Sequence, residues 1–372
     1  MEGFPLPTMI TAVLCLLLIG ATSADPVVVF RHGERGYPCI RVPSIVRTNS
    51  SLLAFAGTRC GAGDGCFPAG NVGKTLDHMD LVMKRSADGG RTWSDLRVLY
   101  STTCDNRDHG TPAYDAVTGR VLLVTRGDNT LTWSLHSDDD GHTWSTPARV
   151  PLGPYNTTRP APGTGLQLRA GGPRAGRLLF LAQLGSGAEA DKGNVVYWTD
   201  DGGDTWAHAM NIVPGGQEAQ VAQLSNGTLL LNARRGLEKG HEYDRLFATS
   251  ADGGASWAPG VRRGGSLAAT SCMGSFLASR YRAVGGASRT RLLYSHPASF
   301  TERSNGTVWV SEDEGATFTP RFQVSPANHS VPFAYSCLTE THKESKYGLL
   351  FETGADDCSG PSCRIMFTTL SL

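Results

Sequence analysis

The sequence predicts an all-β fold, a six-bladed β-propeller, from one recurring motif and from the spacing of its copies. An eight-residue motif, here called the Asp box, follows short β-branched and apolar segments five times. Successive copies start 51, 62, 51 and 61 residues apart. That is about the length of one four-stranded sheet with its loops, and such a period is typical of propellers. The copies are residues 86–93, 137–144, 199–206, 250–257 and 311–318.

Each Asp box has the residue types that a tight hairpin requires. It starts with Ser or Thr, with Asp two positions on, Gly four on, Ser or Thr six on and an aromatic residue seven on. The Asp carboxylate can accept hydrogen bonds from nearby backbone N–H groups, and Gly can take a positive φ. The aromatic ring is left to pack against the next sheet. We therefore interpret the boxes as structural turns without chemistry of their own.

Length and composition agree with one domain made of short strands. With 372 residues and 40% apolar content the chain can bury a large core, and 45 glycines suit many tight turns. Apolar runs at 177–182, 228–233 and 348–352 are bounded by Gly, Pro or Asn and indicate strands. The formal net charge is zero, which argues against a nucleic-acid partner but allows a small anion held by a few arginines.

The N-terminus has the pattern of a secretory signal peptide. Residues 11–20 are apolar but too short to cross a bilayer, and the small residues 21–24 follow. We expect residues 1–24 to be removed by cleavage near Ala24. Residues 25–372 then form the propeller domain, which contains no membrane span.

Cysteines and glycosylation sequons point to the same route. Eight cysteines remain after removal of Cys15, an even number as expected in an oxidising compartment. Cys60 and Cys66, and likewise Cys358 and Cys363, are close enough in sequence to bridge locally, although spacing leaves the connectivity open. Together these features predict a secreted or lysosomal protein. The sequons begin at Asn49, Asn156, Asn226, Asn305 and Asn328.

A short segment near the start of the domain favours a different function when taken alone. Residues 31–35, Arg-His-Gly-Glu-Arg, resemble the Arg-His-Gly-x-Arg motif of histidine acid phosphatases, where the His is the nucleophile. Those enzymes have an α/β fold and a distant His-Asp pair. This sequence has no His-Asp dipeptide and no sustained helical pattern. We therefore interpret the segment as a polar loop leading into the first propeller strand.

The segments between the boxes carry short motifs over essentially the whole domain. Residues 36–46 contain Tyr37, Arg41 and Pro43, and residues 52–59 read Leu-Leu-Ala-Phe-Ala-Gly-Thr-Arg. The first segment resembles the Tyr-Arg-Ile-Pro motif of sialidases, and the second matches that family's Leu-Leu-Ala-Phe-Ala-Glu-x-Arg strand except for Gly57. The resemblance implies an exo-α-sialidase, acting on sialylated glycoproteins, gangliosides or oligosaccharides without a metal or other cofactor. Further matches follow in the family's order at 162–168, 216–224, 231–234, 296–308, 334–336 and 351–352.

Three arginines lie in the matching motifs. Sialic acid carries a carboxylate on its anomeric carbon, and converging guanidinium groups bind a carboxylate through paired, charge-assisted hydrogen bonds. The resemblance assigns this role to Arg41, Arg234 and Arg303, with Glu352 supporting Arg41. A single arginine at a strand end is more often a structural ion pair. Here, however, three motif matches coincide, and Arg234 directly follows an apolar strand.

The same carboxylate disfavours a carboxylate nucleophile, because two anions would meet at the reacting carbon. The resemblance implies a tyrosine nucleophile instead, which departs from the two-carboxylate scheme of most glycosidases. Tyr335 matches this position and Glu218 matches its base. A neutral tyrosine is a weak nucleophile until a base takes its proton. Without the motifs, a core aromatic residue and a surface acid would be the simpler interpretations.

The general acid is where the sequence departs from the family pattern. Family members place an Asp five residues before a second Asp that enters the next strand. Counting back from Asp80 reaches Thr75, which cannot transfer a proton, whereas counting forward from Arg59 reaches Asp64. An insertion in this loop would explain the disagreement. We favour Asp64 over Asp77, with Asp80 third, and expect Arg59 to line the same pocket.

Two functions from different classes fit these observations. The first is an exo-α-sialidase that retains configuration through the tyrosine nucleophile. The second is a non-catalytic propeller that binds sialylated glycans, or a receptor module built on the same boxes. A binding module has no need to keep Tyr335, Glu218 and three arginines together, so the enzyme is favoured. The balance between hydrolysis and trans-sialylation depends on the acceptor subsite and stays open.

Overall fold

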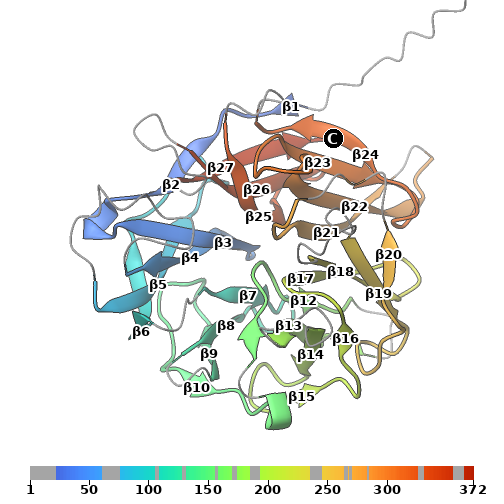
Figure 1. Cartoon of the computed structure of the whole chain (residues 1–372), viewed down its shortest axis with the longest axis horizontal. Helices are drawn as coiled ribbons and strands as arrows, with labels where there is room; N and C mark the ends of the chain where they lie inside the picture. The colour runs from blue at the N-terminus through green and yellow to red at the C-terminus, as the bar shows by residue number, and fades with distance from the viewer. Residues whose placement is uncertain are drawn as a thin grey trace, which may run out of the picture.

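Six β-sheets form a closed ring in the computed structural model of the chain, which confirms the predicted all-β six-bladed propeller (Figure 1). The described residues carry almost no helix. None of their helices is long and apolar enough to cross a membrane. The described residues are 22–60, 76–104, 109–127, 131–155, 158–169, 174–184, 193–234, 245–263, 267, 270–282, 285–325, 331–354 and 364–372.

Each sheet is one blade, and its strands follow one another along the chain. The first blade contains β3 (Cys39–Arg47), β4 (Leu52–Arg59), β5 (His78–Ser86) and β6 (Arg97–Thr103). The second contains β7 (Thr111–Tyr114), β8 (Val121–Arg126), β9 (Thr132–Ser137) and β10 (Ala148–Arg149). The third contains β11 (Arg159–Pro160), β12 (Leu166–Gln167), β13 (Leu178–Leu184), β14 (Gly193–Thr199), β15 (Ala207–His208) and β16 (Val213–Pro214). The fourth and fifth are β17 (Ala219–Gln223), β18 (Leu229–Arg234), β19 (Arg245–Ser250) and β20 (Val261–Arg263); and β21 (Ser275–Arg282), β22 (Ser288–Pro297), β23 (Gly306–Ser311) and β24 (Thr319–Gln323).

The sixth blade joins the two ends of the described chain and closes the ring. It contains β25 (Phe333–Glu340), β26 (Lys346–Thr353) and β27 (Arg364–Ser371), and β2 (Val27–Arg31) pairs antiparallel with β27. The short β1 (Thr22–Ser23) pairs with the other end of β27. In Figure 1 the blue β2 accordingly lies beside the red β27. Residues 31–35 lie at the end of β2 and in the turn before β3, as the loop interpretation predicts.

The Asp boxes are the turns between the third and fourth strands of the first five blades. In the first box, Asp88 Oδ1 accepts the backbone N–H groups of Arg91 and Thr92 at 3.0 Å, and Ser86 Oγ accepts that of Gly90 at 2.8 Å. Burial raises the pKa of Asp88, but hydrogen bonds from Thr92 and Ser86 outweigh it and hold the pKa at about 2. In each of the other four boxes, the hydroxyl oxygen of the first Ser or Thr likewise accepts the Gly N–H, and Asp Oδ1 accepts the backbone N–H of the Ser or Thr four positions on.

The sixth blade has no box because its outer strand comes from the other end of the chain. The hairpin that a box would close, between the third and fourth strands, does not exist where β27 pairs with β2. Five boxes therefore correspond to six blades.

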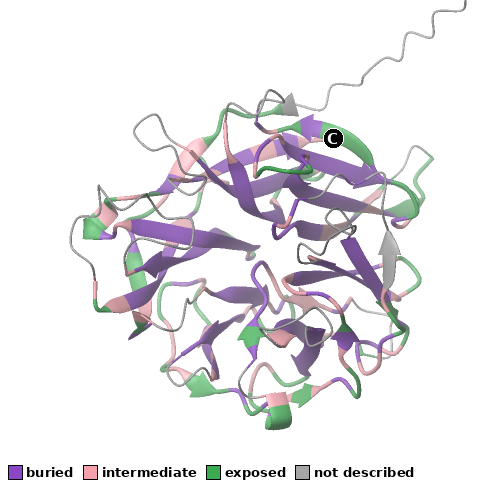
Figure 2. Ribbon diagram, viewed as in Figure 1, coloured by how far each residue is buried: buried purple, intermediate pink, exposed green. Residues whose placement is uncertain are grey.

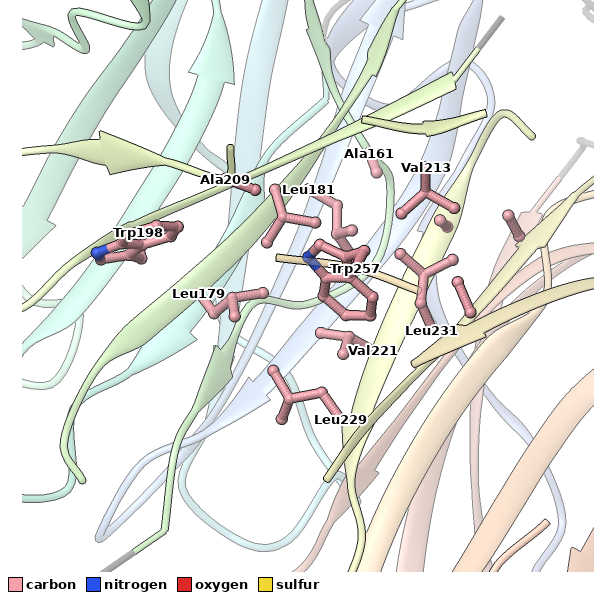
Figure 3. Packing of buried hydrophobic residues seen from close by; sticks show 14 of the residues in the cluster. Ala161, Leu179, Leu181, Trp198, Ala209, Val213, Val221, Leu229, Leu231 and Trp257 are labelled. Carbon is pink, nitrogen blue, oxygen red and sulfur yellow. The ribbon is translucent and has the colours of Figure 1, made fainter. Parts of the chain in front are cut away.

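The core lies between neighbouring blades rather than inside one of them. Figure 2 shows the strands around the centre of the ring buried along most of their length. Figure 3 shows the ring of Trp257, the aromatic residue of the fourth box, surrounded by Leu179, Leu181, Val221 and Leu231 of β13, β17 and β18. The box aromatic thus packs between its own blade and the preceding one.

The first box makes the same inter-blade contact with the sixth blade. The rings of Trp93 and Phe367, which belongs to β27, lie edge to face with centroids 5.5 Å apart. Gly90 has a φ of 92°, and a Cβ built on it would lie 2.0 Å from Phe367 Cε1. This position therefore needs glycine both for its backbone conformation and for the close approach of the neighbouring blade.

The disulfide of Cys60 is not the local bridge to Cys66 that sequence spacing allows. Cys60 is bonded to Cys104, which is 44 residues away, and not to Cys66, which lies outside the described residues. β4 and β6 are both antiparallel to β5, so their ends lie at the same edge of the blade. Cys60 and Cys104 directly follow those ends, a proximity that sequence spacing does not reveal.

The remaining cysteines do not all form disulfides. Cys39 is disulfide-bonded, whereas Cys272 and Cys337 are buried free thiols. The even number of cysteines therefore does not correspond to four disulfides. The other two cysteines that are close enough in sequence to bridge locally, Cys358 and Cys363, lie outside the described residues.

Candidate active site

The strand order brings the predicted site residues to one rim of the ring. The first strand of each blade begins at this rim, and its antiparallel partner ends there. Arg41 therefore lies near the start of β3, Tyr335 near the start of β25, and Glu218 directly before β17. Arg234 and Glu352 lie at the ends of the second strands β18 and β26. Residues separated by up to 311 positions in sequence meet at this rim.

Glu352 holds Arg41 through a buried two-point ion pair. Arg41 Nε and Nη2 donate to the two carboxylate oxygens of Glu352 at 3.1 and 2.9 Å, and Glu352 is fully buried. The backbone N–H of Val42 donates to the same carboxylate at 2.8 Å. Val42 has a φ of 58°, and the register of β3 shifts between Arg41 and Ser44. This irregularity turns the backbone N–H and the guanidinium toward one acceptor.

Tyr335, Glu218 and Arg234 form a second cluster beside this pair. The hydroxyl of Tyr335 donates a short hydrogen bond to Glu218 Oε1. Arg234 Nη1 donates to Glu218 Oε2 at 2.6 Å and lies 3.1 Å from Tyr335 Oη. The carboxylate of Glu218 thus joins an arginine and a tyrosine hydroxyl that come from different blades.

The charges in this cluster favour ionised Glu218 and protonated Tyr335. Burial raises the pKa of Glu218, but the charge of Arg234 and the hydrogen bond from Tyr335 outweigh it and hold the pKa below its ordinary value. Burial and the Glu218 carboxylate raise the pKa of Tyr335 well above 10. The phenol is therefore neutral, and its proton already points at the group that can accept it.

Arg303 completes a ring of guanidinium groups around Tyr335. The Cζ atoms of Arg41 and Arg303 lie 5.3 and 5.4 Å from the centroid of the Tyr335 ring. Arg303 Nη2 donates to the backbone carbonyl of Ser271 at 3.2 Å. Three guanidinium groups with two carboxylates, those of Glu218 and Glu352, leave an excess of positive charge that suits an anionic ligand.

The three candidates for the general acid, Asp64, Asp77 and Asp80, differ in whether the structure describes them and in how exposed they are. Asp64 lies outside the described residues. The Asp77 side chain is 97% exposed and pairs with His78 Nδ1 at 2.7 Å. Asp80 is 4% exposed, and its carboxylate accepts hydrogen bonds from Tyr37 Oη at 2.5 Å and Ser101 Oγ at 2.6 Å. Asp80 is thus enclosed by the first blade.

Arg59 lies at the same rim as Arg41. It is the last residue of β4 and pairs in register with Cys39, two positions before Arg41 on β3. Its side chain is buried, and Nη1 donates to the carbonyl of Thr58 at 2.9 Å. Asp64 follows Arg59 by five positions in the sequence, and the described part of the chain is interrupted after Cys60.

Two residues at this rim were missed by the sequence analysis. His109 lies two positions before the inner strand β7, and its Nε2 contacts the Pro160 carbonyl at 2.9 Å. Burial and the charge of Arg59 lower the pKa of His109 to about 4. Ser271 precedes the inner strand β21, and its Oγ accepts two hydrogen bonds from Arg234. Neither residue lies in a motif, but each precedes the first strand of a blade, as Glu218 does.

Comparison with known proteins agrees with this fold and arrangement. Residues 73–355 match the family of BNR repeat-like domains, and the chain belongs to this family. The relatives and solved structures that the chain resembles are sialidases, in agreement with the resemblance drawn from the motifs. The sialidase of Micromonospora viridifaciens is 30% identical over 358 residues, covering 87% of this chain and 51% of the relative. The sialidase of Bacteroides fragilis strain YCH46 is 26% identical over 359 residues, covering 87% and 62%.

The chain thus spans about half to three fifths of the length of these relatives. Among solved structures, the Hadza microbial sialidase Hz136 superposes with a TM-score of 0.72 at 24% identity, covering 93% of this chain and 68% of that one. The leech intramolecular trans-sialidase superposes with a TM-score of 0.71 at 16% identity, covering 94% and 70%. At these identities the structural likeness concerns the fold.

Proposed function

We propose that this chain is an exo-α-sialidase that hydrolyses terminal sialic acid from glycoconjugates with retention of configuration. The observation that supports this best is the hydrogen bond from Tyr335 to Glu218, enclosed by the guanidinium groups of Arg41, Arg234 and Arg303. A site that only binds an anion needs the arginines. It does not need a neutral phenol whose proton points at a buried carboxylate.

The first chemical step uses Tyr335 as nucleophile. Its oxygen attacks the anomeric carbon while its proton passes to Glu218, and the bond from that carbon to the aglycone oxygen breaks. An acid, for which we propose Asp64 ahead of Asp77, gives the leaving oxygen its proton. A phenol is suited to this step because it is uncharged, whereas a carboxylate would meet the substrate carboxylate at the reacting carbon.

The second step reverses these roles. The carboxylate left on the acid takes a proton from water, the water oxygen attacks the anomeric carbon, and the bond to Tyr335 breaks. The tyrosine oxygen recovers its proton from Glu218. Two displacements at one carbon give net retention, as in other retaining glycosidases.

The arginines bind the substrate carboxylate in this proposal. Glu352 keeps Arg41 in place through its two-point pair, so the guanidinium is already oriented before substrate arrives. Arg59 contacts the sugar ring near its hydroxyl groups. No metal or other cofactor takes part, and the substrates are sialylated glycoproteins, gangliosides or oligosaccharides.

We also propose that the protein follows the secretory route. Residues 1–24 act as the signal peptide, and the product is secreted or delivered to lysosomes. N-terminal sequencing of protein purified from expressing cells tests this directly, since the expected first residue lies near position 25. An intact Met1 would contradict the assignment.

The activity itself is tested with a fluorogenic sialoside and the purified protein. Release of the fluorophore is expected, with none from the matching β-galactoside. If the protein binds sialyl-lactose but hydrolyses neither sialyl-lactose nor the fluorogenic sialoside, the non-catalytic module is favoured instead. NMR of the first-formed sugar product distinguishes retention, which we predict, from inversion, and hydrolysis from internal transfer.

A further inference from the structure

Residues 270–273, which directly precede β21 of the fifth blade, contact several groups of the candidate site. Ser271 Oγ accepts hydrogen bonds from Arg234 Nε at 3.1 Å and from Arg234 Nη2 at 2.9 Å. The carbonyl of Ser271 accepts Arg303 Nη2 at 3.2 Å. One serine therefore contacts two of the three arginines that surround Tyr335.

The segment is itself fixed by a buried arginine. Arg245 is 1% exposed, and its Nη1 donates to the carbonyl of Cys272 at 3.0 Å. Its Nε and Nη2 donate to Asn232 Oδ1 at 3.1 and 2.6 Å. Asn232 lies on β18 two positions before Arg234, so Ser271 and Arg234 are held against the same strand. The position of Ser271 Oγ is thus set before any ligand binds.

The contacts of Arg234 divide between two sides of its guanidinium. Nη1 donates to Glu218 and Tyr335, whereas Nε and Nη2 on the other edge both donate to Ser271 Oγ. A guanidinium next to a carboxylate favours a two-point pair through one edge. If Ser271 did not occupy the Nε–Nη2 edge, Arg234 could rotate and form such a pair with Glu218. That pair would compete with Tyr335 for the carboxylate.

We propose that Ser271 is a positioning residue that limits Arg234 to a one-point contact with Glu218, so that Glu218 stays available as the base for Tyr335. This inference rests on the proposed sialidase function and deepens it. The effect acts through Arg234 on the proton transfer rather than through contact with substrate. Because Arg234 also binds the substrate carboxylate in the proposed function, its rotation is expected to affect KM as well as kcat, and the pH dependence is the readout specific to Glu218.

Several groups set the charge around Glu218 and bear on the test. Arg234 lies on β18, Tyr335 on β25 and Arg303 between β22 and β23. Three further groups interact with the charge of this carboxylate. They are His109, which lies just before β7, Cys272, which lies just before β21, and Arg245, the first residue of β19. Replacing Ser271 changes none of these titratable groups. A change in the acid side of the pH profile would therefore report the altered pairing of Arg234.

The experiment compares Ser271→Ala with Ser271→Thr and with Ser279→Ala. Ser279→Ala is a matched control, because Ser279 lies on β21 in the same blade and its Oγ donates to Glu340 Oε1 at 2.7 Å. For Ser271→Ala we expect kcat to fall about 10- to 100-fold, a part of the usual contribution of a general base, and KM to rise as Arg234 turns toward Glu218. The acid side of its kcat/KM profile should move to lower pH.

Ser271→Thr keeps the hydroxyl and is expected to restore most of kcat and the wild-type profile. Ser279→Ala should match wild type in both. Thermal unfolding of all variants establishes that each is folded. This inference alone is overturned if Ser271→Ala keeps the wild-type kcat. It is also overturned if Ser271→Ala loses kcat while its kcat/KM pH profile stays unshifted and Ser271→Thr does not restore activity. Absence of turnover by the wild-type protein would overturn the proposed function, and this inference with it.

Discussion

Glu218 and Arg234 face each other across the open end of the β17–β18 hairpin. The backbone N–H of Arg234 donates to the Glu218 carbonyl at 3.0 Å, and their side chains are joined by the ion pair at 2.6 Å. The base and its arginine are therefore positioned by the same antiparallel ladder. Tyr335, which belongs to the sixth blade, joins the pair through its hydrogen bond to Glu218.

The first prediction concerns the pH dependence of activity. Arg234 and Tyr335 overcome the effect of burial and hold the pKa of Glu218 below its ordinary value near 4.5. The ionised base is thus present above the depressed pKa, and activity is lost as pH falls through it. We expect the acid side of the kcat/KM profile to lie below that ordinary value. An acid side clearly above that value would contradict the arrangement.

The same shift has a consequence for stability. A carboxylate with a depressed folded pKa stabilises the folded state above its unfolded pKa, and this contribution is lost as pH falls through the folded value. Glu218→Gln should therefore flatten the pH dependence of unfolding on the acid side. Urea denaturation at a series of acidic pH values measures the difference from wild type.

The second prediction is that Arg303→Lys weakens catalysis far more than a surface exchange does. Lysine keeps the charge but loses the paired donors of the guanidinium. The expected loss in kcat/KM corresponds to roughly 1.5–3 kcal/mol, the range for a hydrogen bond to a charged group. Arg321→Lys is the control, because Arg321 is exposed on β24 of the same blade. Equal kcat/KM for both variants would place Arg303 outside the substrate site.

The third prediction separates the acid candidates by leaving group. An aryl sialoside needs little protonation of its leaving oxygen, whereas a sialyl-galactose needs a full proton transfer. Asp64→Ala should lose about 10²–10⁴-fold on the natural linkage and much less on the aryl sialoside, since general acid catalysis contributes in that range. Asp77→Ala should show neither loss, because its side chain is 97% exposed and pairs with His78. The reverse pattern would make Asp77 the acid.

The fourth prediction tests the contact between the first and sixth blades. Gly89 and Gly90 are adjacent and both have positive φ, but only Gly90 has a neighbour within the reach of a Cβ, the ring of Phe367. Gly89→Ala should cost about 1–2 kcal/mol from backbone strain. Gly90→Ala should lose about 1–3 kcal/mol more from overpacking. Equal unfolding free energies in urea would show that Phe367 moves aside at no cost.

Much of the fold followed from the sequence because the Asp box is a local structure. Its hydrogen bonds join residues at most four positions apart, so the pattern is complete within eight residues. The closure by β2 is not local, which explains why five boxes correspond to six blades. The pairing of Cys60 with Cys104 could not be read from the sequence for the same reason, since it depends on which strands of a blade run parallel.

The candidate site was predicted as far as its motifs extend. Tyr335, Glu218 and the arginines lie in segments whose order matches the family, and the structure brings them together. Ser271 and His109 belong to no motif, and they reach the rim only through their place before an inner strand. The partners of Arg234 could not be foreseen either, because they come from three different blades.

The most direct test of the account is to identify the residue that forms the covalent intermediate. Protein incubated with an activated fluorosialoside is digested, and the labelled peptide is mapped by mass spectrometry. We predict one sialyl group on Tyr335 and none in Tyr335→Phe, a variant that should still bind a sialic-acid transition-state analogue. A label on Glu218, or no label in a protein that turns over the fluorogenic sialoside, would contradict the tyrosine nucleophile.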